Sequence, residues 1–204
     1  MLDLWLIRHG ETTWNAEKRI QGHMDSPLSE LGTRQANALA KRLFSKKFDA
    51  IYSSDSGRAL QTAAIVFRGQ HPCLDERLRE MHYSILEGRI RTEFSVDEEK
   101  HYAAYKRDPY NWRTPGGENW QDLFVRVDAW MKSLPEDGVV AAVTHGGVVR
   151  AALCLMVGYP KSYEWNVVVD NVSITRFHIL SEQKILVTFN DTAHTEGLLQ
   201  DDDD

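Results

Sequence analysis

The sequence predicts an α/β fold: a three-layer sandwich whose central sheet is mainly parallel, with one antiparallel strand, and is flanked by helices. Short apolar runs alternate with segments of helical spacing, the pattern of a parallel sheet covered on both faces. The 204 residues are 42% hydrophobic, and no repeat or flexible linker divides them. We therefore expect one domain over residues 1–190, with a helical lid inserted at about 80–115.

Five apolar runs are the expected strands. Residues 2–7 read LDLWLI, residues 50–52 read AIY, and residues 139–143 read VVAAV. Each run is short and largely uninterrupted by charge, which is typical of buried parallel strands. Residues 172–177 and 185–189 predict two further strands, adjacent and antiparallel to each other.

Helical spacing fills the segments between these strands. Ser29 is suited to cap a helix in which apolar residues recur every three or four positions through Phe44. Further helices are expected at about 57–64, at 119–134, and from Gly146 through Leu155. Between about 80 and 115, charged and aromatic residues mix without one period, which indicates a lid outside the core. The polar tail, 191–204, ends in four aspartates and is expected to be disordered.

Composition excludes several classes of protein. The chain has 24 Lys and Arg against 30 Asp and Glu, a net charge of −6, or −2 without the four terminal aspartates. A nucleic-acid-binding protein would show a basic excess instead. No apolar run approaches the length needed to span a bilayer, and Met1 opens no signal-peptide pattern. Two cysteines, Cys73 and Cys154, suit a reducing compartment. We expect a cytoplasmic protein without nucleic-acid or membrane partners, and a homodimer stays open.

Three of the expected strands are followed by polar residues suited to binding an anion. The first strand leads into Arg8 and His9, the second is followed by Arg58 just inside a helix, and the third ends before His145. Ligands of open α/β sheets bind outside the carboxyl ends of the strands. Two guanidiniums and two imidazoles converging there would bind a compact dianion, most simply a phosphoryl group. Any one of these residues alone is more often structural, but the joint pattern favours a site.

Other phosphate and metal sites lack their motifs. The sequence contains no G-x-x-x-x-G-K-[ST] and no G-x-G-x-x-G, so a nucleotide-type loop is excluded. It also contains no H-E-x-x-H and no C-x-x-C pair, which argues against zinc. Phosphoryl transfer spreads negative charge over oxygens, and Arg8, Arg58 and a cationic His145 could stabilise that charge. We therefore expect no metal and no cofactor.

Several motifs, in order, resemble one known family, the histidine phosphatase superfamily of phosphoglycerate mutase-like proteins. The resemblance covers roughly residues 2 to 180. The motifs that carry it are Arg8-His9-Gly10-Glu11-Thr12 with Asn15, Leu28-Ser29-Glu30-Leu31-Gly32, Tyr52-Ser53-Ser54-Asp55, Arg58-Ala59-Leu60-Gln61-Thr62, Leu78-Arg79-Glu80, Pro115-Gly116-Gly117-Glu118 and Thr144-His145-Gly146-Gly147.

The resemblance implies a role for each matched residue. His9 would take the phosphoryl group as phosphohistidine, and Glu80 would protonate the leaving oxygen and then activate water. The other matched residues would surround the phosphate: Arg8, Asn15, Gln21, Gly22, Arg58 and His145. The implied activity is metal-independent hydrolysis of a small organic phosphomonoester.

Two alternatives remain beside the phosphatase. The mutases of the family are usually longer, with extra lid residues for the phosphoglycerate carboxylate, and this lid has only about 35 residues. The length favours a phosphatase over a cofactor-dependent phosphoglycerate mutase, and the intact site argues against a non-catalytic phosphate-binding protein. After Glu80 the family pattern of aromatic-Gly-x-Trp-Glu-Gly is altered, with Ser84 and Leu86 in place of Gly and Trp. Because of this departure, the family pattern does not predict which residues contact the leaving group, and the physiological substrate stays undetermined.

Overall fold

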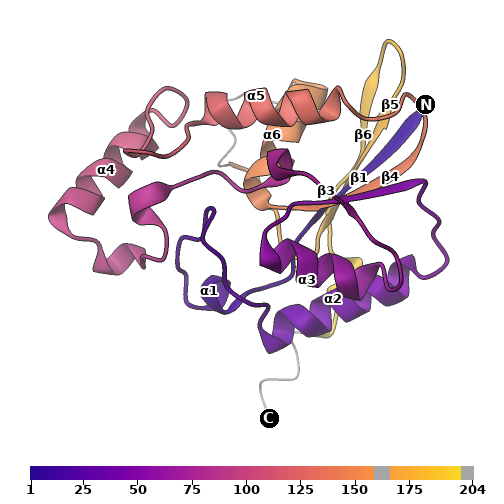
Figure 1. Ribbon diagram of the computed structural model, residues 1–204, viewed down its shortest axis with the longest axis horizontal. Helices are drawn as coiled ribbons and strands as arrows, with labels where there is room; N and C mark the ends of the chain where they lie inside the picture. The colour runs from indigo at the N-terminus through magenta and orange to yellow at the C-terminus, as the bar shows by residue number, and fades with distance from the viewer. Residues whose placement is uncertain (159–165, 199–204) are drawn as a thin grey trace.

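A six-stranded sheet forms the centre of the protein, in the order β3-β2-β4-β1-β5-β6 (Figure 1). The computed structural model describes residues 1–158 and 166–198. The strands are β1 (Leu2–Arg8), β2 (Ala50–Ser53), β3 (Cys73–Leu74), β4 (Gly138–Thr144), β5 (Ile174–Ile179) and β6 (Lys184–Asp191). β1 to β4 pair in parallel, and β5 is antiparallel to both β1 and β6. This confirms the predicted mainly parallel sheet with one reversed strand.

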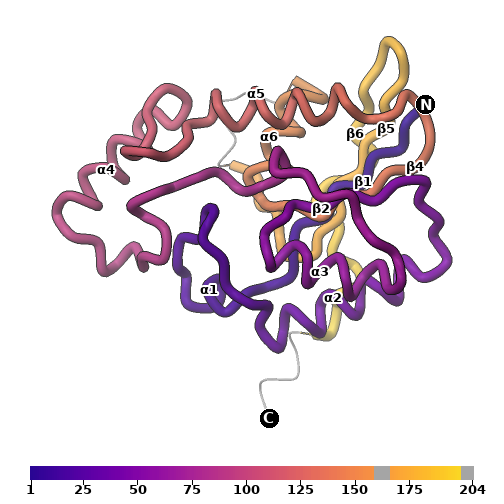
Figure 2. Tube along the Cα trace, in the orientation of Figure 1, coloured from indigo at the N-terminus to yellow at the C-terminus, as the bar shows by residue number. Residues whose placement is uncertain are grey.

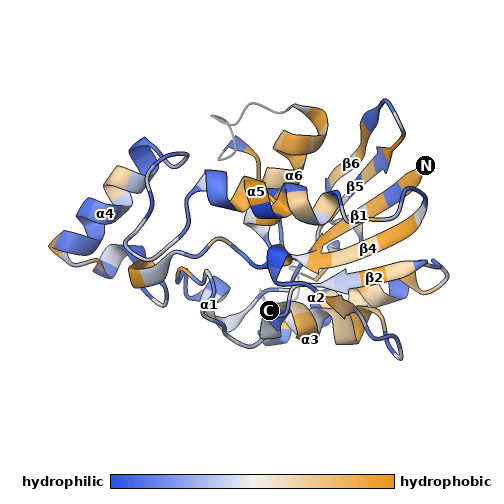
Figure 3. Cartoon of the chain, turned by 45° about the horizontal axis from the view of Figure 1, so that its top comes forward, coloured by the Kyte–Doolittle hydropathy of each residue, from blue (hydrophilic) through white to orange (hydrophobic). Residues whose placement is uncertain are grey.

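Helices cover both faces of the sheet. α2 (Glu30–Leu43) and α3 (Gly57–Val66) lie on one face, and α5 (Trp120–Met131) and α6 (Gly146–Val157) lie on the other (Figure 1). Successive residues of a strand point to opposite faces, so Leu6 of β1 packs with α5 and α6 while Ile7 packs with α2 and α3. The three-layer arrangement follows from this apolar-on-both-sides pattern, which Figure 3 shows as orange strands.

The helix boundaries agree with the capping residues of the sequence. Ser29 Oγ accepts a hydrogen bond from Gly32 N–H at 2.9 Å and begins α2. Asn119 caps α5 in the same way through Asp122 N–H at 3.0 Å. β3 was not expected, because a two-residue strand carries no hydrophobic period.

The segment predicted as a lid is helical and stands away from the sheet (Figure 2). It contains two short 3₁₀ helices, η2 (Ser84–Leu86) and η3 (Arg91–Glu93), and one longer helix, α4 (Val96–Arg107); a further 3₁₀ helix, η1 (Glu76–Leu78), lies just before this segment. α4 is mostly hydrophilic (Figure 3), and Tyr105 is its one buried side chain. A short helix near the N-terminus, α1 (Thr13–Ala16), faces the lid.

The prediction of a disordered tail from residue 191 is wrong for residues 191–198. Asp191 ends β6 and forms a bidentate ion pair with Arg42 of α2, and a 3₁₀ turn, η5 (Ala193–Thr195), follows. The polar composition hid this segment because its contacts are polar: they tie it to the surface of α2. Asp201–Asp204 lie outside the described residues. Within the described ranges, no helix combines the length and hydropathy needed to cross a membrane.

Candidate active site

The carboxyl ends of β1, β2 and β4 bring the predicted anion-binding residues together. In the parallel register Arg8 pairs with Thr144, and His9 N–H donates to Thr144 O at 2.9 Å. The next residue along β4 is His145, whose ring lies 5.1 Å from the His9 ring, centroid to centroid, edge to face. The sheet therefore places the two imidazoles side by side, as the strand ends predicted.

Hydrogen bonds hold both the ring and the backbone carbonyl of His9. Its Nδ1–H donates to Gly10 O at 2.7 Å, which leaves Nε2 as the ring nitrogen with a free lone pair. Its carbonyl oxygen accepts hydrogen bonds from Val172 N–H at 3.2 Å and Asn171 Nδ2 at 3.0 Å. Sequence reasoning missed Asn171, because nothing in its local pattern marks a residue 162 positions away in the chain as a partner of His9.

Two guanidiniums lie in the same cavity as His9: Arg58 is buried and Arg8 is half-buried, and each donates to oxygen acceptors. Arg58 is fully buried: its Nη atoms donate to Gly22 O at 2.7 Å, to Met24 O at 2.9 Å and to Asp25 Oδ1 at 2.8 Å. Arg8 Nη1 donates to Val169 O at 2.5 Å. In the described part of the chain, Nε of each arginine is buried without a hydrogen-bond partner. Buried donors nearly always have a hydrogen-bond partner, so an oxyanion bound between the two arginines would accept hydrogen bonds from both Nε–H groups.

Burial and positive charge keep both imidazoles neutral. Desolvation, followed by the charges of Arg58 and Arg8, lowers the pKa of His9 well below 6.5. Desolvation and the charge of Arg58 lower the pKa of His145 in the same direction. In the free protein this lowered pKa favours the neutral ring, so the expected cationic His145 stays a prediction for the phosphate-bound site. A bound dianion would favour its protonated form, because an opposite charge nearby stabilises the cation.

Glu80 reaches the same cavity from the loop after η1. Its Oε1 accepts a hydrogen bond from Met81 N–H at 2.8 Å, and its Oε2 accepts one from Gly147 N–H at 3.1 Å, at the start of α6. A Cβ at position 147 would lie 2.1 Å from Glu80 Oε1, so glycine is required for this approach. The Glu80 carbonyl accepts two further bonds, each of 2.9 Å, from Arg126 Nη2 and His23 Nε2.

Glu87, the other carboxylate near the lid, is used differently. Its side chain is 3% exposed and accepts hydrogen bonds from the backbone N–H groups of His23 at 2.9 Å, Met24 at 2.8 Å and Tyr83 at 2.8 Å. The Glu87 carboxylate therefore links the loop of His23 and Met24 to the loop of Tyr83 through backbone hydrogen bonds, which is a structural role. Glu80 is therefore the carboxylate that the geometry offers for proton transfer.

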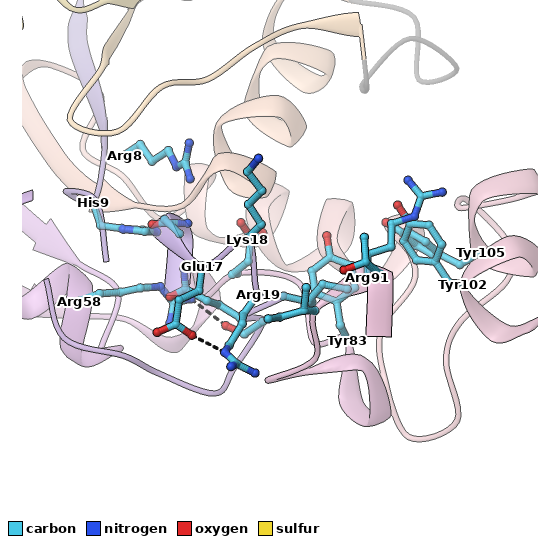
Figure 4. Close-up of a pocket in the computed structure, with 17 residues that line it drawn as sticks. Arg8, His9, Glu17, Lys18, Arg19, Arg58, Tyr83, Arg91, Tyr102 and Tyr105 are labelled. Atoms are coloured by element: carbon cyan, nitrogen blue, oxygen red, sulfur yellow. Dashed lines mark hydrogen bonds and ion pairs between the residues drawn. The ribbon is translucent and has the colours of Figure 1, made fainter. Parts of the chain in front are cut away.

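A cavity of about 580 Å³ opens above these residues (Figure 4). It is lined by seven of the eight predicted site residues: Arg8, His9, Asn15, Gln21, Gly22, Arg58 and Glu80. The eighth, His145, is fully buried, with its ring next to that of His9. Gln21 Nε2 donates to Thr12 Oγ1 at 2.9 Å, and Gly22 adopts φ +59°, which lets its carbonyl meet Arg58. The lid adds Tyr83, Tyr102 and Tyr105 to the wall.

Among the residues that the structure describes, no three His, Cys, Asp or Glu side chains are grouped to hold a metal ion. The positive charge of the cavity comes instead from arginine and lysine side chains: Arg8, Lys18, Arg19, Arg58 and Arg91.

Comparison with known proteins assigns the family. The model of the histidine phosphatase superfamily (branch 1) matches residues 4–192. The chain belongs to the histidine phosphatase superfamily. The predicted resemblance to this family is confirmed.

Relatives in the superfamily carry both phosphatase and mutase names. A protein of Yersinia pestis described as a probable phosphoglycerate mutase GpmB is 35% identical over 206 residues, covering 96% of each chain. The structure of YhfR from Bacillus stearothermophilus superposes with a TM-score of 0.88 at 33% identity, covering 96% of this chain and 100% of that one. A putative α-ribazole-5′-P phosphatase from Escherichia coli gives a TM-score of 0.86 at 28% identity, covering 94% and 97%. These relationships support a phosphatase- or mutase-type enzyme.

The buried neutral histidines predict how stability depends on pH. Their folded-state pKa values lie below 6.5, so below pH 6.5 the unfolded chain binds more protons than the folded one. Stability is then complete above pH 6.5 and falls as the pH decreases. Between pH 7.5 and 5.5 we expect the free energy of unfolding in urea to fall by about 2 kcal/mol.

The variant His9→Asn isolates one of the two contributions. It should lose about 1 kcal/mol less than the wild type over the same interval, because only His145 then remains buried and neutral at the site. Equal losses in the two proteins would show that His9 does not take part in this proton linkage.

Proposed function

We propose that the protein hydrolyses small organic phosphomonoesters through a phosphohistidine on His9, without a metal ion. One observation carries this proposal: a neutral imidazole whose Nδ1–H is held by Gly10 O lies beside two guanidiniums whose buried Nε–H groups have no partner among the described residues. A nucleophile must present a lone pair, and a transferring phosphoryl group must be surrounded by positive charge. The end of β1 offers both.

The first half of the reaction moves the phosphoryl group to the protein. His9 Nε2 attacks phosphorus, an N–P bond forms, and the P–O bond to the leaving group breaks with its electron pair on oxygen. Glu80, in its protonated form, donates its proton to that oxygen. Arg8 and Arg58 stabilise the charge on the non-bridging oxygens throughout. His145 becomes more easily protonated as the dianion binds and then adds a third cation.

The second half returns the protein to its starting state. Glu80, now a carboxylate, removes a proton from water, the resulting O–P bond forms, and the N–P bond to His9 breaks. Inorganic phosphate is the product. Two transfers at one histidine replace a single difficult attack by water.

The competing proposal is a mutase, in which a second hydroxyl takes the place of water. A relative bears that name, and the matched site residues do not separate the two reactions. The lid here, η2 to α4, spans residues 84–107, and it is the part that would have to hold the substrate for its return to the same pocket.

Assays on the purified protein test this proposal. We expect inorganic phosphate release from p-nitrophenyl phosphate to persist after exhaustive EDTA treatment, with vanadate and phosphate as competitive inhibitors, because the charge in the cavity is supplied by side chains. A loss of activity on chelation that Mg²⁺ restores would refute the metal-independent mechanism. Interconversion of 2- and 3-phosphoglycerate faster than phosphate release would favour the mutase.

A further inference from the structure

The cavity holds more positive charge than one phosphoryl group uses. Of its five basic residues, four have a partner for their cationic group. Those four pairings are Arg8 with Val169 O, Arg58 with Asp25, Arg19 with Glu17, and Arg91 over the Tyr102 ring at 4.7 Å. The fifth is Lys18, whose ammonium has no hydrogen bond or ion pair to any residue in the described ranges. It is the free cation of the cavity wall.

Lys18 also has an unusual backbone conformation. It follows the C-cap of α1, its N–H donates to Asn15 O at 3.0 Å, and its φ is +57°. This left-handed position after a helix is usually filled by Gly or Asn, because a Cβ is disfavoured there. The Lys18 side chain is exposed, so packing does not account for a long residue at this point. Residues held in such conformations cluster at functional sites.

The direction of the side chain agrees with a role in the cavity. Glu17 and Arg19 on either side of Lys18 face each other, whereas the Lys18 chain extends to the opposite side, on which Arg8 also lies (Figure 4). Arg8 and Arg58 belong to the phosphoryl position, and the apolar walls of Ile20 and Ile90 leave space for an organic group. One free ammonium at this wall balances one negative charge.

We propose that Lys18 selects phosphomonoesters whose organic part carries a carboxylate. This inference rests on the proposed hydrolase activity and adds the charge class of the leaving group. The left-handed backbone at position 18 is unfavourable for lysine, and an ion pair between its ammonium and a substrate carboxylate in the cavity would offset that strain. A neutral or cationic leaving group would leave the ammonium without a partner.

Two substrates that differ only in a carboxylate test the inference directly: O-phosphoserine and O-phosphoethanolamine. We expect wild-type kcat/KM to favour O-phosphoserine, and Lys18→Gln to reduce that ratio about tenfold, the value of a charge-assisted hydrogen bond. Lys18→Gly should reduce the ratio equally while its Tm stays at or above the wild-type value, because glycine relieves the left-handed strain. A loss of selectivity at undiminished Tm cannot be attributed to misfolding.

Arg91→Gln provides the matched control, since it removes a cation from the same cavity that already has the Tyr102 ring as partner. It should change the substrate ratio by no more than about twofold. The inference is overturned if the wild type does not prefer O-phosphoserine, or if Lys18→Gln leaves the ratio unchanged while both substrates are hydrolysed. Failure of the wild type to hydrolyse either of them or p-nitrophenyl phosphate would instead overturn the hydrolase proposal on which the inference rests.

Discussion

Substitution of His9 by alanine is expected to abolish formation of the phosphoenzyme. The Nε2 lone pair of His9 is the nucleophile that takes the phosphoryl group from the substrate in the proposed mechanism, and the methyl group of alanine cannot replace it. Wild-type protein quenched during turnover of a ³²P-labelled substrate should carry a label that is acid-labile and alkali-stable, as a phosphoramidate is. The His9→Ala protein should carry none.

His145→Ala is the control for this experiment. It removes a neighbouring ring but not the nucleophile, so labelling should continue at a lower rate. The expected loss of transition-state stabilisation is roughly 3–4 kcal/mol. An acid-stable label on Ser54, whose Oγ lies 2.9 Å from His145 Nε2, would move the nucleophile from histidine to serine and contradict the assignment.

Glu80→Gln is expected to slow transfer from an alkyl phosphate to His9 by roughly 10²–10⁴-fold, the usual contribution of general acid catalysis. An alkoxide is strongly basic and requires a proton as it leaves. A p-nitrophenolate ion is stabilised by its ring and hardly requires one, so the first turnover of p-nitrophenyl phosphate should be much less affected. Glutamine is nearly isosteric with glutamate, but its single side-chain oxygen can accept from only one of the two donors, Met81 N–H and Gly147 N–H, that Glu80 binds through separate oxygens.

The measurement has to resolve the first turnover, because the same residue activates water in the second step. With p-nitrophenyl phosphate, Glu80→Gln should show a rapid burst of phenolate followed by slow hydrolysis of the phosphohistidine. Glu87→Gln is the comparison variant, since Glu87 accepts backbone hydrogen bonds and should show no dependence on the leaving group. Equal losses for both substrates in the burst phase of Glu80→Gln would remove Glu80 from the role of acid.

Most of the fold could be predicted from the sequence because each of its parts is local. A strand such as 139–143 is marked by a continuous apolar run, and the start of α2 by Ser29 with Gly32 three residues later. The antiparallel pair β5 and β6 is marked by two segments of alternating or mixed apolar and polar residues separated by a short polar turn. These signals lie within a few residues of the structures that they specify.

The features that the sequence did not predict depend on contacts between residues far apart in the chain and not on local sequence patterns. The ion pair between Arg42 and Asp191 joins residues 149 positions apart and orders a segment whose composition indicated disorder. Asn171 reaches the carbonyl of His9 across a similar separation. Charge state follows the same rule: complete burial beside Arg58 lowers the pKa of His145 in the free protein, an effect that its local sequence does not indicate.

The sequence by itself determined the order of the strands' polar ends, and therefore that Arg8, His9, Arg58 and His145 meet at one edge of the sheet. Chain direction in a parallel sheet fixes that outcome. Only the tertiary structure shows how two nearby carboxylates differ in their surroundings: Glu80 lines the cavity, whereas Glu87 accepts hydrogen bonds from the backbone of two loops. It also shows that, among the basic residues of the cavity wall, Lys18 has no partner in the described part of the chain, because pairing depends on which groups the fold brings within a few ångströms.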